Sequence, residues 1–132
     1  MTRKWKTGPI GNDRQFKANV DLKRGEIVIA VLAGDYGKPQ PALVVQSDLF
    51  NATHASVLLC PITTDIRDLP LIRATLTPNR GNGLKSVSQV MVDKVTAVSR
   101  ERIRQKTGRV SSSLMEQVNS LLRVWLNLET AE

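Results

Sequence analysis

The side chains that most often carry out chemistry in proteins are scarce in this chain of 132 residues. It has one histidine, His54, in the polar stretch 51–54, and one cysteine, Cys60, in the apolar run 57–61. One residue of each type cannot complete a zinc site, and no Cys-x-x-Cys or His-x-x-x-His spacing occurs. No phosphate-binding loop of the Walker type and no Gly-x-Ser-x-Gly motif is present. We therefore expect neither a metal ion nor an organic cofactor.

A basic loop leads into an apolar segment within residues 34–45, and its charge pattern is unexpected. Gln40 stands between Pro39 and Pro41, directly before the apolar run 42–45. A cation would be expected here if the loop bound an anion, because a guanidinium offers fixed charge and a forked pair of donors. Gln40 offers a hydrogen-bond donor without the charge.

Six short segments have the composition of β-strands. They are rich in branched apolar residues and are separated by glycine, proline and asparagine, which favour turns. The predicted strands are 26–32, 41–46, 55–62, 71–76, 88–92 and 95–98. Regular short strands with turns between them predict a mainly β domain, a small barrel or sandwich.

The C-terminal part of the chain has the pattern of an amphipathic helix. Ser113 and Glu116 fit a capping box, in which Ser113 would be the N-cap residue. Apolar residues then recur at steps of four and three, as on one helix face. They are Leu114, Val118, Leu121, Trp125 and Leu128. We expect this helix to close the β domain, with Trp125 packed in the core.

Composition limits the class of protein. Hydrophobic residues make up 41% of the chain, enough for one compact core, and only 4% are aromatic, so an aliphatic core is predicted. No run of about 18 apolar residues and no signal-peptide pattern occurs, which favours a cytoplasmic protein without membrane contact. Residues 1–24, with seven Lys or Arg and two Asp, supply +5 of the net charge of +7. We therefore expect a basic, flexible N-terminal arm, residues 1–23, before a domain formed by residues 24–132.

Four short motifs occur in an order known from one protein family. They are Arg24-Gly25-Glu26-Ile27, Pro41-Ala42-Leu43-Val44-Val45, Cys60-Pro61-Ile62-Thr63-Thr64 and Ser88-Gln89-Val90-Met91-Val92-Asp93-Lys94-Val95. With the C-terminal helix, they resemble the MazF/PemK family of toxin–antitoxin toxins, which are metal-independent endoribonucleases. The likeness covers roughly residues 24 to 128. It implies a small SH3-like (CcdB/PemK-like) barrel with a C-terminal helix, and a homodimer.

The resemblance also assigns roles to particular residues. The family's catalytic threonine corresponds to Thr63, and an acidic residue proposed to take part in proton transfer corresponds to Asp93. The family's essential arginine, directly before the proline of the second strand, corresponds to Gln40. Losing one well-placed donor to the transition-state oxyanion costs on the order of 10²–10³ in rate. Glutamine at this position therefore predicts impaired catalysis, and we expect Gln40→Arg to raise cleavage at least about 10²-fold.

Another cation can take over the charge that Gln40 lacks, and the candidates are Lys38, Arg67, Arg73 and Lys94. Cationic loops are also where contacts to single-stranded RNA are expected, because such RNA is read by stacking and by hydrogen bonds to base edges. The predicted RNA-binding residues are Tyr36, Lys38, Arg67, Arg73, Arg80, Lys85 and Lys94. The other implied partner is an antitoxin whose acidic, disordered segment folds onto the basic surface.

Two other functions are open to a chain with this fold. Gyrase-poisoning toxins of the CcdB type act through the end of the terminal helix, where Trp125 stands, and perform no chemistry. A catalytically inactive relative would only bind its antitoxin. The motifs around Pro41 and Pro61 resemble the ribonuclease branch more closely, so we predict an endoribonuclease toxin.

Overall fold

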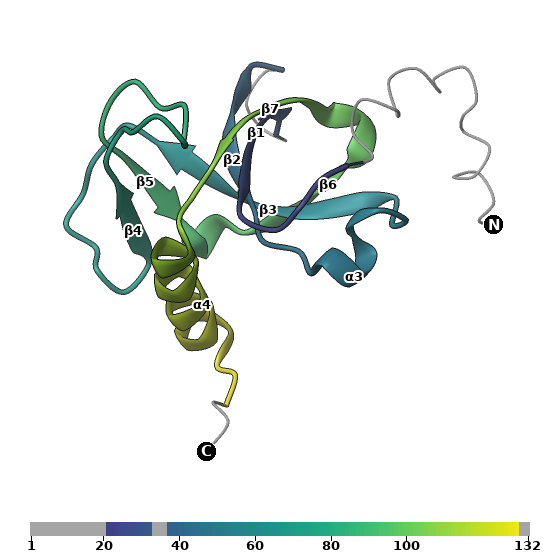
Figure 1. The fold of residues 1–132 in the computed structure, drawn as a ribbon. Helices are drawn as coiled ribbons and strands as arrows, with labels where there is room; N and C mark the ends of the chain where they lie inside the picture. Colours follow the sequence, from purple (N-terminus) through teal and green to yellow (C-terminus); the bar gives the residue numbers. More distant parts are fainter. Residues whose placement is uncertain (1–20, 33–36, 130–132) are drawn as a thin grey trace.

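The computed structural model describes residues 21–32 and 37–129, so residues 1–20 of the predicted arm and Tyr36 lie outside the described residues. An antiparallel, curved sheet carries the helix α4 (Ser112–Leu126) against one face (Figure 1). The strands are β1 (Glu26–Val31), β2 (Pro39–Val44), β3 (Ser56–Thr63), β4 (Arg73–Leu76), β5 (Ser88–Met91), β6 (Thr96–Ser99) and β7 (Ile103–Arg109). Their order is β4-β5-β3-β2-β1-β7, and β6 pairs with β3 beside this path. The mainly β fold with a C-terminal helix is confirmed.

Two hydrophobic clusters form because successive side chains of a strand point to opposite faces of the sheet. In β3, Leu59 belongs to a cluster built mainly from β1, β2, β3 and β6, whereas Cys60 and Ile62 belong to the cluster under α4. Leu22, within the range of the predicted arm, is 2% exposed and belongs to the first cluster. The alternation along β3 therefore decides which of its residues face the helix.

All six predicted strands occur, with ends that differ by one or two residues. Strand β2 begins at Pro39, and its pairing with β3 begins only at Ala42, opposite Pro61. Pro39 and Pro41 have no N–H to give to a second ladder, and this start of β2 pairs with β1 but not with β3. The sequence does not predict β7, because only Ile103 of this strand is buried and no alternation of apolar and polar residues results.

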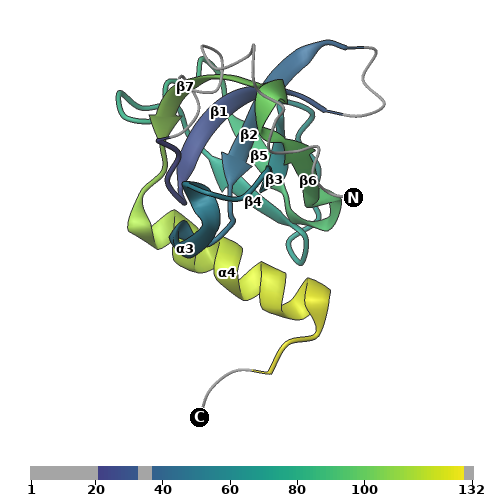
Figure 2. The same ribbon diagram turned by 90° about the vertical axis from the view of Figure 1, so that its right-hand side faces the viewer.

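Helix α4 differs from the predicted helix in its N-cap residue and in the burial of its C-terminal end. The N-cap residue is Ser111, whose Oγ accepts the N–H of Leu114 at 3.1 Å, so the prediction that Ser113 caps the helix is wrong. Trp125 is 48% exposed, and the prediction that it packs in the core is also wrong. Figures 1 and 2 show the reason, since the end of α4 reaches past the strands. Neither α4 nor the short helix α3 (Asp48–Asn51), within the described part of the chain, is long and apolar enough to cross a membrane.

The β4–β5 connection, residues 77–87, is fixed against β7. Asn82 is buried and hydrogen-bonds backbone groups of this same connection. Gly83 has a φ of 67°, and a Cβ there would lie 2.4 Å from the carbonyl oxygen of Thr107 in β7. Only glycine allows so close an approach with this backbone conformation. The connection therefore presents its exposed side chains from a fixed position.

Candidate active site

A row of polar side chains crosses three neighbouring strands on one face of the sheet. Thr63, the last residue of β3, pairs with Gln89 of β5, and Gln89 pairs with Thr75 of β4. Residues directly opposite each other in antiparallel strands turn their side chains to the same face. Gln89 Nε2 donates to Thr75 Oγ1 at 3.2 Å. Strand pairing thus joins residues that are far apart in the sequence.

Gln89 is the centre of this row and is 5% exposed. Its Oε1 accepts the backbone N–H of Arg67 at 3.0 Å and a hydrogen from Arg73 Nη1 at 2.7 Å. Its Nε2 donates to the carbonyl oxygen of Arg67 at 3.1 Å. Gln89 therefore fixes both the β3–β4 connection and the Arg73 side chain against the sheet.

Three of the candidate residues meet at Asp65, in the connection that follows β3. Thr63 Oγ1 accepts the N–H of Asp65 at 3.0 Å, and Arg73 Nη1 donates to the carbonyl oxygen of Asp65 at 3.0 Å. Arg67 binds Asp65 Oδ2 through Nε at 3.0 Å and Nη2 at 2.9 Å. The Thr63 hydroxyl accepts in this arrangement, so its own hydrogen can be donated to a phosphate oxygen. One residue thus gathers a hydroxyl donor and two guanidinium groups.

Gln40 lies at the start of β2, the strand next to β3. The pairing of these strands ends at Ala42 and Pro61, and Gln40 and Thr63 each lie two positions beyond that pair, at the same end. Side chains two positions apart in a strand point to the same face. Position 40 therefore continues the polar row beyond Thr63, and Lys38 is exposed just before it.

Asp93 and Lys94 are not part of this row. They lie in η2 (Val92–Lys94), a 3-10 helix that contacts α4. Asp93 Oδ1 is buried and makes no hydrogen bond to any residue that the structure describes. Lys94 is exposed. The structure separates both residues from Thr63, because η2 packs on the α4 face of the sheet and the Thr63 side chain points to the other face.

Cys60 is a fully buried thiol on the α4 face. Burial raises the pKa of Cys60 to about 12, the Arg24 charge lowers it and the Asp93 charge raises it further. The thiol is therefore protonated at neutral pH and is not a nucleophile. His54 is exposed. Within residues 21–32 and 37–129, no group of three His, Cys, Asp or Glu residues is placed to hold a metal ion.

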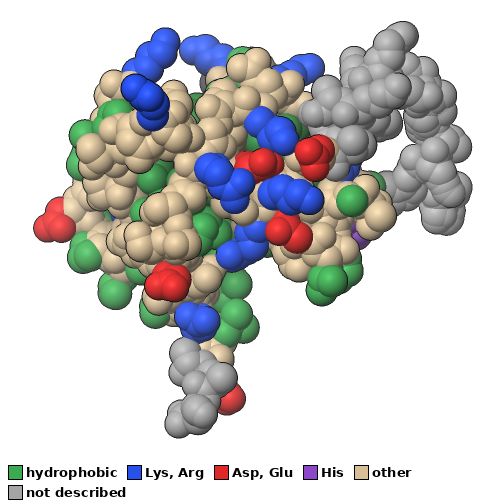
Figure 3. Space-filling view, viewed as in Figure 1, with side chains coloured by type: hydrophobic (Ala, Val, Ile, Leu, Met, Phe, Trp, Pro, Cys, Tyr) green, Lys and Arg blue, Asp and Glu red, His purple; other side chains and the backbone are tan. Residues whose placement is uncertain are grey.

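The cations Arg80 and Lys85 are exposed on the connection that is fixed against β7. Figure 3 shows Lys and Arg side chains along the upper edge of the molecule, and a second group in which positive and negative side chains are mixed. Among the described ion pairs, Lys106 Nζ lies 3.7 Å from Asp21 Oδ2 and 3.6 Å from Glu26 Oε2. Carboxylates therefore compensate part of the positive charge of the described surface.

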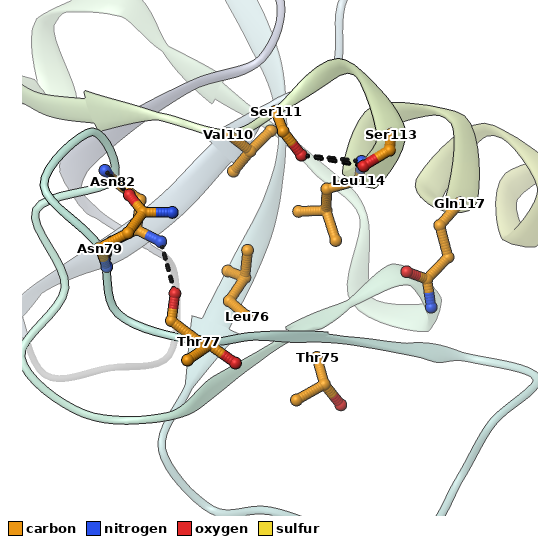
Figure 4. A pocket seen from close by; sticks show the side chains of 10 residues that line it. All are labelled: Thr75, Leu76, Thr77, Asn79, Asn82, Val110, Ser111, Ser113, Leu114 and Gln117. Atoms are coloured by element: carbon orange, nitrogen blue, oxygen red, sulfur yellow. Dashed lines mark hydrogen bonds between the residues drawn. The ribbon is translucent and has the colours of Figure 1, made fainter.

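A hollow of about 310 Å³ lies between β4, the β4–β5 connection and the first turn of α4 (Figure 4). It is lined by Thr75, Leu76, Thr77, Asn79, Asn82, Val110, Ser111, Ser113, Leu114 and Gln117. None of these side chains carries a charge. A phosphate group would find no cation there to balance it, so the polar row around Thr63 is the stronger candidate site.

Two residues of the site, Asp65 and Gln89, are not identified from the sequence. Asp65 stands in a predicted loop, and nothing in its spacing shows that Thr63, Arg67 and Arg73 converge on it. Only one sequence feature could have identified Gln89, namely an amide side chain within an otherwise apolar strand. Such a side chain needs hydrogen-bond partners when it is buried.

Similarity to known proteins extends over most of the chain. A sequence model of the family described as PemK-like, MazF-like toxin of type II toxin-antitoxin system matches residues 23–126. The probable endoribonuclease MazF of Mycolicibacterium smegmatis is 41% identical over 108 residues, which are 81% of this chain and 98% of that protein. The endoribonuclease EndoA of Bacillus subtilis is 22% identical over 111 residues, which are 81% of this chain and 96% of that protein.

Solved structures share the fold. The Mycobacterium tuberculosis toxin MazF-mt6 has a TM-score of 0.70 at 22% identity, over 80% of this chain and 99% of that chain. An endoribonuclease from a mycobacterial species, in complex with its cognate antitoxin, has a TM-score of 0.68 at 21% identity, over 83% of this chain and 99% of that chain. The family match and the 41% identical relative each span most of this sequence. The chain therefore belongs to the PemK-like, MazF-like toxins of type II toxin–antitoxin systems.

Proposed function

We propose that this toxin is an endoribonuclease that cleaves single-stranded RNA and is neutralised by a cognate antitoxin. The observation that carries the proposal is the convergence of Thr63, Arg67 and Arg73 on Asp65. Relatives named as endoribonucleases, one of them 41% identical, support it. We place this activity in the cytoplasm, where cellular RNA is available.

The polar row suits cleavage in which the RNA attacks itself. The 2′-oxygen forms a bond to phosphorus while the bond from phosphorus to the 5′-oxygen breaks, which gives a 2′,3′-cyclic phosphate and a 5′-hydroxyl. The 2′-hydroxyl loses its proton to a base, and the leaving 5′-oxygen takes up a proton. Negative charge grows on the phosphate in the transition state, and fixed hydroxyl and guanidinium donors stabilise it. Thr63 and an arginine of the row are suited to this task.

We propose that the neighbouring loops bind the nucleotides on either side of the cleaved bond. Lys38 precedes the row, and Arg80 and Lys85 stand on a fixed connection. Contacts from such cations to phosphates add affinity that falls with salt. Tyr36, outside the described residues, is proposed to stack on a base. A part for Asp93 in proton transfer rests on the family resemblance alone.

The test uses a long single-stranded RNA of mixed sequence in EDTA, beside a single-stranded DNA of the same sequence. We expect RNA fragments that end in a 2′,3′-cyclic phosphate, and no cleavage of the DNA, because DNA has no 2′-hydroxyl. RNA that stays intact at high protein concentration would contradict the proposal.

We further propose that the chain forms a homodimer and offers an apolar surface to its protein partners. Exposed apolar side chains gather in α3 and at the end of α4. They are Leu49, Phe50, Val124, Trp125, Leu126 and Leu128. Four of them lie within residues 124–128 at the end of α4, and a patch of exposed apolar side chains marks an interaction site. Light scattering at micromolar concentration is expected to give the mass of a dimer, and the mass of a monomer would contradict this.

The same exposed end of α4 favours one second candidate function. Trp125 is 48% exposed with Val124 at 60% beside it, so this helix end could anchor the chain on gyrase, as in toxins of the CcdB type. A supercoiling assay with purified gyrase separates the two functions. Inhibition of gyrase by a chain that leaves RNA intact would establish the second function in place of the first.

A further inference from the structure

We propose that Arg73 supplies the positive charge that Gln40 does not, and that Arg73 and Thr63 together bind the phosphate at which RNA is cleaved. This inference rests on the proposed RNA cleavage. It assigns a catalytic residue that the family resemblance does not assign, and it commits to one of the four cations that the sequence leaves as alternatives.

The Arg73 side chain is held in one orientation. Its Nη1 donates to Gln89 Oε1 at 2.7 Å and to the carbonyl oxygen of Asp65 at 3.0 Å. These two acceptors occupy both hydrogens of Nη1 and leave Nε and Nη2 for other acceptors. Nε is buried and makes no hydrogen bond to any described residue. Nη2 has no hydrogen bond in the described part of the chain and, unlike Nε, is not buried, so Nη2 is the donor that a phosphate oxygen can reach.

Arg73 also lies close to the hydroxyl that is expected to act on the same phosphate. Thr63 and Arg73 bind the N–H and the carbonyl oxygen of one residue, Asp65. Both belong to the face defined by the Thr63, Gln89 and Thr75 pairs, because Arg73 precedes Thr75 by two positions in β4. A phosphate over Thr63 would therefore have Gln40 on its β2 side and Arg73 on its β4 side.

The other three candidate cations are less suited to this role. Arg67 already forms an ion pair with the Asp65 carboxylate, and its side chain is 61% exposed. Lys38 is exposed before β2, and Lys94 is exposed in η2 on the opposite face of the sheet. Of the four, Arg73 alone is partly buried. A partly buried charge is screened less by salt and solvent, and a charge fixed in advance needs no reorganisation during the reaction.

The decisive experiment compares cleavage by four variants of the full chain with cleavage by the unchanged protein, all in EDTA. Arg73→Gln is expected to lower cleavage about 10²–10³-fold, the loss typical of a missing oxyanion donor. The matched control is Arg102→Gln, an exposed arginine of η3 (Arg100–Arg102), which follows a strand paired with the other end of β3 from Thr63. This control is expected to keep cleavage within about threefold, because it removes the same charge from a distant site.

Two further variants test whether an arginine at position 40 and one at position 73 supply the same positive charge. Gln40→Arg is expected to restore cleavage at least about tenfold in the Arg73→Gln protein, because it returns a guanidinium to the row. In the unchanged protein, Gln40→Arg is expected to add less than about tenfold, in place of the gain of about 10²-fold that the sequence alone predicts, because Arg73 already supplies the charge. Arg73→Gln that cleaves as fast as the unchanged protein, or a gain of 10²-fold from Gln40→Arg alone, would overturn the inference.

A binding measurement separates this inference from the proposed cleavage. An RNA strand with 2′-O-methyl groups cannot be cleaved, and its affinity is measured at several salt concentrations by fluorescence anisotropy. Arg73→Gln is expected to reduce the slope of log K against log salt by about 0.7, the value for one phosphate contact of a single strand. Arg73→Lys keeps the charge, so its slope is expected to remain unchanged while cleavage falls, because the fork of donors is lost.

These outcomes distinguish the two failures. A chain that binds the methylated RNA with the expected loss of slope, but cleaves no RNA, would disprove the cleavage and keep Arg73 as the phosphate-binding residue. An unchanged slope in Arg73→Gln, or no binding of RNA at all, would overturn the inference about Arg73. Circular dichroism of each version establishes that the variants are folded.

Discussion

Two neighbouring residues of β3, Ile62 and Thr63, face opposite sides of the sheet and have contrasting surroundings. Ile62 is 3% exposed and packs with Val90 and Val92 in the cluster under α4. Thr63 faces the polar row, where Gln89 holds the β3–β4 connection in place. The α4 face holds the strands to the helix. The other face carries the cluster that contains Leu59, and only beyond this cluster, at the end of β3, do donors and charge gather.

The difference shows how a small domain separates stability from chemistry. The α4 face is closed by aliphatic side chains, and it contains the buried thiol of Cys60. In the polar row, hydrogen bonds hold two guanidinium groups near a hydroxyl. Changes in the polar row should therefore act mainly on activity, and changes on the α4 face mainly on stability.

Among changes on the two faces, the largest effect is expected from Thr63→Ala, which should lower RNA cleavage. Cleavage of single-stranded RNA should fall about 10²–10³-fold, because the hydroxyl donor to the phosphate is removed. The melting temperature should change little, since Thr63 is only partly buried and its one described side-chain hydrogen bond is to the N–H of Asp65. Cleavage rate and thermal unfolding are measured on the same preparation. Retained cleavage would remove Thr63 from the active site.

The next prediction is that alkaline pH lowers the stability of the fold, because the thiol of Cys60 is buried on the α4 face. The pKa of Cys60 rises from 9.0 to about 12 on folding, mainly through burial. Its contribution to stability is therefore complete below pH 9 and is lost as the pH rises toward 12, by up to about 1.4 kcal/mol for each pH unit. Urea unfolding at pH 7, 9 and 10 measures this loss. The control is Cys60→Ala, which should lose less stability over the same interval, and an equal loss would contradict the prediction.

A smaller effect is expected from Ile62→Val, a change in the neighbouring residue that faces α4. Removing one buried methylene should lower the free energy of unfolding by about 0.5–1.5 kcal/mol. The cleavage rate of the folded protein should stay within about twofold, because Ile62 faces α4 and not the polar row. Urea unfolding and the RNA assay are run together. A large loss of cleavage with intact stability would show that the two faces are not independent.

Asp93→Asn is also expected to have only a small effect on cleavage. Its carboxylate lies on the α4 face, where its charge acts on Cys60, so cleavage should change less than about tenfold, well below the loss for a donor that contacts the reacting phosphate. The pH profile of cleavage is measured beside the rate. A loss of 10²-fold with an altered acidic limb of the pH profile would show that Asp93 reaches the RNA. Residues on both faces would then take part in the reaction.

Much of the fold follows from local patterns in the sequence. The six predicted strands and the buried stripe of Leu114, Val118 and Leu121 are predictable because each depends on apolar residues at a regular period. Strand β7 is not predictable, since it lies at an edge of the sheet and buries only Ile103. Ser113 fits a cap motif as well as Ser111 does, and only the path of the chain into α4 selects Ser111.

The sequence by itself determined the family, the mainly β class and the absence of spacings for a zinc site, because motif order, periodicity and composition are properties of the chain. It also placed Thr63 at the end of a strand and Gln40 before one. Only the tertiary structure decided that Gln89 clamps the β3–β4 connection, that Arg67 and Arg73 converge on Asp65, and that Asp93 faces the helix instead. The physical reason is register, since pairing between strands far apart in the sequence decides which side chains share a face.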